Sequence, residues 1–178
     1  RTSCKGLRML GYVVPQGRGA SDVLIREVAA RLRDGGVRLA GAVQINVETG
    51  PDTKCMMDLH VLSGFDVVRI SQNLGALSRG CRLDPDGLER AVGLVSASLR
   101  DGAALLIVNK FGKQEADGRG FRPVIGEALA AGIPVLTAVG PSNVEAFLSF
   151  AEGLAEELPE DASAIETWCR AQIAEHAS

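Results

Sequence analysis

The chain has 178 residues, 46% of them hydrophobic, which is enough to form one well-buried domain. A net charge of -3 and an aromatic content of 4% argue against general nucleic-acid binding and against stacking of single-stranded bases. The four cysteines form no CxxC pair, and no run resembles a signal peptide or a membrane span, so we expect a reduced, cytoplasmic protein without a membrane partner.

Short apolar runs alternate with amphipathic runs in the first part of the chain. They predict a buried strand, a helix and a second strand at residues 7–14, 20–34 and 37–46. Two more apolar runs, at 55–62 and 66–70, are joined through Ser63 and Gly64 and predict an antiparallel hairpin. Residues 71–83 are rich in Gly, Ser and Arg, and we expect them to be irregular.

The second part of the chain continues the alternation. Asp84 is predicted to cap a helix that has Pro85 in its first turn and runs to about residue 100. The later elements are predicted as strands at 105–108 and 134–139 and helices at 121–131, 142–158 and 163–176.

This alternation predicts a single α/β domain over residues 1–178, with 159–178 as a C-terminal helical extension. Its sheet should be mainly parallel, covered by helices on both faces, with one inserted β-hairpin. Such sheets bind ligands at the carboxyl ends of their strands. The loops after Val14, Val108 and Val139 should therefore meet along one edge.

The loop after the first strand resembles a degenerate phosphate loop. Against the pattern G-x-x-x-x-G-K-[ST], Val14 replaces the first Gly and Ala20 replaces the Lys, while Ser21 keeps the hydroxyl. Glycines and the free N–H groups of a helix start can hold an oxyanion. The candidate ligand-binding residues here are Gly17, Arg18, Gly19, Ala20 and Ser21. The alternative is a flexible turn in which Ser21 or Asp22 caps the helix.

A second candidate group follows the strand at 105–108. A phosphate-hydrolysing P-loop protein has a metal-binding Asp and often a catalytic Glu here, whereas this chain has Asn109 and Lys110. We therefore expect no Mg²⁺ and no catalytic residue. Asn109, Lys110, Gly112 and Lys113 are instead predicted to bind an anion, with Lys110 taking over the charge-neutralising role of the metal. The alternative is that both lysines are ordinary solvent-facing residues.

Arginines between glycines form a third group, since such arginines suit bidentate contact with a tetrahedral oxyanion. The candidates are Arg79, Arg82, Arg119 and Arg122. The alternative is that they form surface ion pairs with Asp84, Asp117 or Glu127.

The cysteines suggest no metal site. In a strand, Cys55 and His60 point to opposite faces, which favours packing over metal binding at Cys55. Cys81 lies among arginines that would lower the pKa of its thiol, so it is a candidate reactive thiol.

Two resemblances follow from these motifs. The segment from Val108 to Glu115 resembles the second motif, D-E-I-G-x-x-E, of a small nucleoside-triphosphatase family. The chain more closely resembles a bacterial domain-of-unknown-function family of the P-loop NTPase superfamily. That likeness rests on C-x-M-D-L from Cys55, S-R-G-C-R-L-D-P from Ser78, N-K-F-G-K-x-E from Asn109 and G-R-G-F-R from Gly118. It implies a link with molybdate-uptake or molybdoenzyme genes.

Three functions remain open from the sequence. The first is a non-hydrolysing protein that binds a nucleotide, another phosphate-bearing ligand or an oxyanion such as molybdate. The second is an enzyme, a nucleoside-triphosphatase or phosphoryl-transfer relative, which the missing Lys and Asp disfavour. The third is an interaction module with a vestigial site, whose C-terminal helices bind a protein partner.

Overall fold

The computed structural model describes residues 8–17, 19–47, 56–72 and 82–176. Its main feature is a seven-stranded sheet with the strand order β4-β3-β2-β7-β8-β1-β9. Neighbouring strands from β2 to β9 are parallel, while β3 runs antiparallel to both β2 and β4. The predicted fold class, a mainly parallel sheet with an inserted hairpin, is confirmed.

The strands of the main sheet are β1 Leu10–Val13, β2 Leu39–Val47, β3 Met56–Val61, β4 Val67–Arg69, β7 Leu105–Phe111, β8 Val135–Val139 and β9 Ala155–Glu157. Two further short strands, β5 Ser71–Gln72 and β6 Arg82–Leu83, pair with each other. The predicted irregular segment therefore has a paired strand at each of its described ends.

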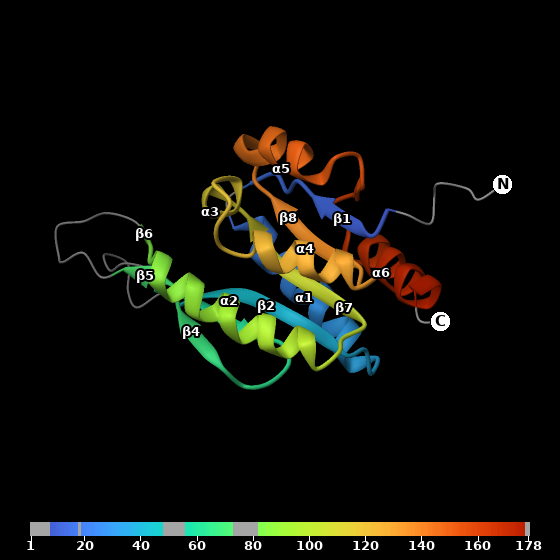
Figure 1. Cartoon of the computed structure of the whole chain (residues 1–178), viewed down its shortest axis with the longest axis horizontal. Helices are drawn as coiled ribbons and strands as arrows, with labels where there is room; N and C mark the ends of the chain where they lie inside the picture. The colour runs from blue at the N-terminus through green and yellow to red at the C-terminus, as the bar shows by residue number, and fades with distance from the viewer. Residues whose placement is uncertain (1–7, 18, 48–55, 73–81, 177–178) are drawn as a thin grey trace.

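Helices cover both faces of the sheet (Figure 1). The helices are α1 Ala20–Asp34, α2 Pro85–Arg100, α3 Lys113–Ala116, α4 Arg122–Ala130, α5 Val144–Ala151 and α6 Ala162–His176, with a 3-10 turn, η2, at Pro141–Asn143. Buried side chains of α1 and α6 form one core cluster, and those of α2, α4 and α5 form the other. None of the helices in the described part of the chain is long and apolar enough to cross a membrane.

The central strand β7 explains why the core is continuous on both faces. Leu105 and Ile107 belong to the cluster under α1 and α6, and Leu106 and Val108 belong to the cluster under α2 and α4. All four are fully buried. A strand covered on both sides needs apolar residues at every position, which is why this run does not alternate.

Two helix boundaries agree closely with expectation. Helix α1 has the predicted bounds, and Gly35 and Gly36 follow its last residue. Helix α2 begins at Pro85, where the Asp84 carboxylate accepts a hydrogen bond from the Asp86 N–H at 3.1 Å. The predicted cap at Asp84 is therefore confirmed.

The predicted helix at 142–158 is wrong, because α5 ends at Ala151. Glu152 adopts left-handed backbone with a φ of 48°, and Gly153 follows with a φ of 82°. This reversal sends residues 155–157 back as β9, which pairs with β1. The Leu158 N–H also donates to the Tyr12 carbonyl at 2.7 Å. A left-handed turn ending in glycine is a common helix terminator.

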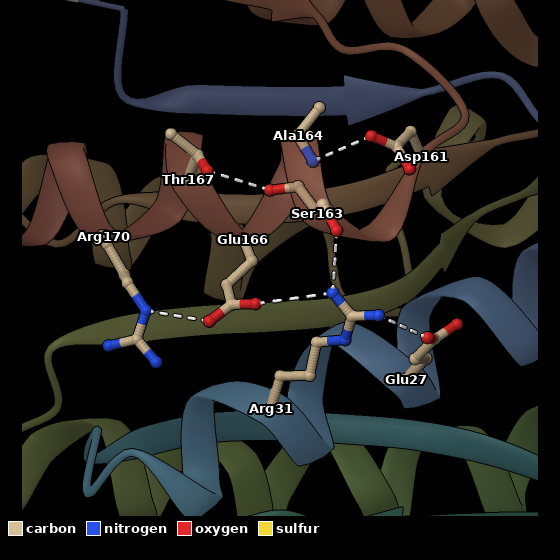
Figure 2. A network of polar contacts seen from close by, with 8 residues as sticks. All are labelled: Glu27, Arg31, Asp161, Ser163, Ala164, Glu166, Thr167 and Arg170. Atoms are coloured by element: carbon tan, nitrogen blue, oxygen red, sulfur yellow. Dashed lines mark hydrogen bonds and ion pairs between the residues drawn. The ribbon is translucent and has the colours of Figure 1, made fainter.

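Helix α6 packs against α1 and β1 as part of the core. Trp168 lies so close to β1 that a Cβ on Gly11 would be 2.7 Å from its ring. Polar contacts also join α6 to α1 (Figure 2). Arg31 of α1 donates to the Ser163 hydroxyl at 3.1 Å and lies 3.6 Å from the Glu166 carboxylate. Glu166 also pairs with Arg170 on the next turn.

A close approach of β2 and β7 generates the first prediction. Gly41 lies opposite Ile107, has a φ of 117°, and an added Cβ would be 1.9 Å from the Ile107 carbonyl oxygen. Replacing Gly41 with Ala combines backbone strain with overpacking, so we expect a loss of about 2–5 kcal/mol in the free energy of unfolding, measured by urea denaturation.

Gly126 provides the matched control. It lies in α4, is exposed, and an added Cβ would meet nothing within 4 Å. Gly126→Ala should stabilise the protein by about 0.5–1 kcal/mol, because alanine favours the helix. Equal effects of the two substitutions would show that β2 and β7 are not packed in this way.

Candidate functional site

The connection from β1 to α1 requires glycine at two positions. Gly17 and Gly19 have φ values of 101° and 75°, and an added Cβ at either would meet nothing within 4 Å. Ala20 begins the helix, and Gly19 provides no side-chain cap. The first N–H groups of a helix have no intrahelical partner. This loop therefore presents backbone to open space, as the phosphate-loop hypothesis requires, but it lacks a lysine at Ala20.

A polar network ties the first turn of α1 to the ends of β7 and β2. The Asn109 amide donates to Asp22 Oδ1 at 2.8 Å, and the Asn46 amide lies 3.3 Å from Asp22 Oδ2. Asn109 Oδ1 in turn accepts the Gln44 backbone N–H at 2.9 Å. Asn109 is only 3% exposed. The first turn of α1 therefore meets the carboxyl-terminal part of β7 through Asn109.

Asp22 is the residue that sequence reasoning assigned only to capping. Its carboxylate lies beside Asn109, at the end of the strand where an aspartate was expected. The acidic group is thus on the helix and its amide partner is on the strand. The sequence feature that could have identified Asp22 is its position directly after Gly19-Ala20-Ser21, in the first turn of a predicted helix.

The expected end of the strand at Val108 is also corrected, because β7 continues to Phe111. The pairing of β7 with β8 shifts register between Val108 and Phe111. Lys110 is exposed while its neighbours Asn109 and Phe111 are buried. The Lys110 side chain reaches the residue that follows β8, with its Cε 3.7 Å from where a Cβ on Gly140 would be.

Glu115 stabilises the segment after β7 through hydrogen bonds to its backbone. Its carboxylate accepts the Gly112 N–H at 2.9 Å and the Phe121 N–H at 3.0 Å, and it is only 4% exposed. Burial raises the pKa of Glu115 above its ordinary value, and these two hydrogen bonds oppose that rise. Gly120 is needed beside it, because a Cβ there would be 1.8 Å from Glu115 Oε2. Glu115 thus shapes the loop that carries Lys113.

The described arginines have structural contacts. Arg122 lies over the Phe150 ring at 5.0 Å and is within 3.5 Å of the Glu115 and Ala116 carbonyl oxygens. Arg119 is exposed and 3.6 Å from Asp117, which matches the surface-pair alternative. Of the other candidates, Arg18, Cys55, Arg79 and Cys81 lie outside the described residues, and Arg82 is described only as part of β6.

A cavity of about 470 Å³ lies at the carboxyl end of β7, on the face covered by α2 and α4. Its polar and glycine lining residues are Gln44, Asn109, Lys110, Gly112, Lys113, Gln114, Glu115 and Asn143. Its apolar lining residues are Met57, Leu59, Ile70, Leu83, Leu88 and Phe121. All six belong to the α2 and α4 core cluster or pack against it.

The cavity brings together only part of the predicted site. It gathers Asn109, Lys110, Gly112 and Lys113, but Gly17, Gly19, Ala20, Ser21, Arg119 and Arg122 do not line it. Within the described part of the chain, neither lysine forms an ion pair with a carboxylate. The cavity therefore combines two exposed lysines, which we call its rim, with an apolar floor. The floor was missed in the sequence because it comes from five separate segments.

Comparisons with known proteins agree with the observed fold. The crystal structure of THEP1 from the hyperthermophile Aquifex aeolicus superposes with a TM-score of 0.58 over 89% of this chain and 94% of that chain, at 15% sequence identity. That likeness shows a P-loop NTPase-like fold. The chain is also 38% identical over 150 residues to "Molybdenum import ATP-binding protein ModC 2" of Bradyrhizobium diazoefficiens.

That relative is much longer, since the match covers 84% of this chain but only 17% of ModC 2. A family model described as "Protein of unknown function (DUF2478)" matches residues 10–168, which include every strand of the main sheet and the first part of α6. The chain therefore belongs to the DUF2478 family.

Proposed function

We propose that this protein binds an anion without hydrolysing it and acts as an accessory protein in molybdenum metabolism. The ligand is a phosphate-bearing compound or an oxyanion such as molybdate. The observation that carries the proposal is the pair of lysines, Lys110 and Lys113, on the rim of one cavity at the carboxyl end of β7. The similarity to a molybdenum import protein supports the metabolic setting.

The charges around the cavity favour an anion. Lysine ammonium groups form short, charge-assisted hydrogen bonds with phosphate-like oxygens. Glu115 is the one carboxylate among the described lining residues, and both of its oxygens accept backbone N–H groups. The two ammonium groups therefore dominate the local charge.

The start of α1 fits a magnesium nucleotide poorly. A phosphate loop uses a lysine to reach the phosphates, and Ala20 stands at that position. Asp22 places a negative charge in the first helical turn, where the helix dipole would otherwise attract an anion. Its two oxygens already accept amide hydrogen bonds from Asn109 and Asn46. We therefore assign the anion to the lysine side of the strand end.

One observation favours phosphoryl transfer as a second candidate function. Asp22 places a carboxylate beside the end of β7, and enzymes that transfer phosphoryl groups use such a carboxylate to bind a metal. This candidate ranks second because Ala20 supplies no positive charge and the Asp22 oxygens are engaged.

The anion proposal is tested by thermal unfolding with phosphate, sulfate, molybdate or tungstate. An anion present at a hundredfold excess over its Kd should stabilise the fold by about 2.7 kcal/mol. For a domain of this size that corresponds to a rise in Tm of about 5–10 °C. Added salt should weaken the shift, because the lysines are exposed.

Charge-matched variants locate the effect. Lys110→Ala and Lys113→Ala should each reduce the shift and change ligand-free stability by about 0.5 kcal/mol or less. Arg100→Ala removes the same charge at the far end of α2, where Arg100 is exposed and 3.4 Å from Glu127, and should keep the full shift. The proposal fails if no anion raises the Tm, or if Arg100→Ala reduces the shift as much as the lysine variants do.

The second candidate is tested by nucleotide hydrolysis. The purified protein should release no phosphate from ATP or GTP above background with or without Mg²⁺, because Ala20 provides no lysine for the phosphates. Asp22→Asn should behave like the unmodified protein in the same assay. Mg²⁺-dependent turnover that is lost in Asp22→Asn or Lys110→Ala would establish phosphoryl transfer in place of simple binding.

A further inference from the structure

The cavity that carries Lys110 and Lys113 has a second feature, its apolar floor. We infer that its ligand is an organic anion with an apolar ring body, and that a bare inorganic oxyanion is not its natural occupant. The acidic group lies against the lysines and the ring lies on the floor. This inference rests on the proposed anion-binding function and specifies the chemical class of its ligand.

The floor is formed by side chains that converge from separate elements. Met57 and Leu59 point from β3 toward the α2 face, and Leu88 and Phe121 come from α2 and from the start of α4. Met57 and Leu83 are only half-buried, so they leave apolar surface facing the cavity. Covering apolar surface is favourable in proportion to its area. A ligand with an apolar body would gain this energy, and a bare oxyanion would not.

The size of the cavity leads to the same conclusion. Its volume of about 470 Å³ lies in the range of sites for organic ligands, about 300–1,000 Å³. A water molecule takes about 30 Å³, and a tetrahedral oxyanion is equivalent to only a few waters. An oxyanion held at the lysines would therefore leave most of the floor in contact with water.

Polar groups around the floor suit a ring with polar atoms on its edge. Gln114 and Asn143 line the cavity, and their side-chain amides form no hydrogen bond with the described residues. Asn109 is unsuited to this role, because its amide is engaged by Asp22 and Gln44. The arrangement resembles ligand sites in general, where a mainly apolar wall carries a few polar groups that orient the ligand.

Three probes separate the contributions of charge and ring: inorganic phosphate, 1-naphthyl phosphate and the neutral 1-naphthol, each titrated by calorimetry into the full chain. We expect 1-naphthyl phosphate to bind at least about tenfold more tightly than inorganic phosphate, because only its ring covers the floor. We expect 1-naphthol to bind more weakly than 1-naphthyl phosphate. Lys113→Ala should weaken both phosphates.

A pair of neighbouring variants tests the floor directly. Met57→Trp fills the cavity and should weaken 1-naphthyl phosphate by about tenfold or more, with little effect on inorganic phosphate. Met56→Trp is the matched control, because Met56 is on the same strand but points to the α1 face. It should leave both affinities unchanged. Leu83→Gln, which makes the floor polar without enlarging a side chain, replaces Met57→Trp if that variant does not fold.

The outcomes separate this inference from the proposed function. If inorganic phosphate binds through Lys113 but 1-naphthyl phosphate binds no more tightly, the inference is wrong and the anion-binding proposal stands. The inference is equally wrong if Met57→Trp and Leu83→Gln leave 1-naphthyl phosphate binding intact. If 1-naphthol binds as tightly as 1-naphthyl phosphate and Lys113→Ala has no effect, the anion-binding proposal is wrong. Binding of none of the three probes overturns both.

Discussion

The hydrogen bond between Asn109 and Asp22 determines how the carboxyl edge of the sheet is arranged. It joins the end of β7 to the first turn of α1 at 2.8 Å and turns Asn109 toward the α1 face. Gln44 then binds the remaining amide oxygen, so the position of β2 is tied to the same point. With Asn109 engaged on that side, Lys110 emerges beside β8 and lines the cavity on the α2 and α4 side. The negative charge of Asp22 and the positive charge of Lys110 are thereby placed on different sides of the strand end.

This separation gives the strand end a distribution of charge that differs from that of a P-loop hydrolase. In a P-loop hydrolase, positive charge from the loop and negative charge from the strand end combine to bind a metal nucleotide. Here the helix start carries Asp22 and the strand end carries Lys110, with Lys113 following on α3. Glu115 keeps Lys113 in place by bonding Gly112 and Phe121 across the loop. The similarity to THEP1 therefore lies in the architecture, and the chemistry of this family member depends on its own side chains.

Local signals in the sequence were sufficient for elements whose boundaries depend on local chemistry. Helix α1 ends at paired glycines and α2 begins at an Asp-Pro cap, and both were predicted correctly. The strand end at β7 was not, since polar Asn109 and Lys110 suggested a loop. The strand continues because Phe111 pairs with Val139 of β8, while the Asn109 side chain is bonded by Asp22 and Gln44. Helix 142–158 was overextended because the acidic, amphipathic pattern continues through Glu152 and Gly153. The cavity floor depends on tertiary contacts among distant segments, which no local pattern reveals.

The central claim is that an anion binds at the lysine side of the strand end and not at the start of α1. Diffraction from crystals soaked in tungstate tests this most directly, because the anomalous signal of tungsten locates the anion. We predict a peak within hydrogen-bond distance of the Lys110 or Lys113 ammonium group, inside the cavity that also contains Gln114 and Asn143. A peak bound instead by the backbone N–H groups of Gly19, Ala20 and Ser21 would contradict the account. It would show that the anion binds at the phosphate loop.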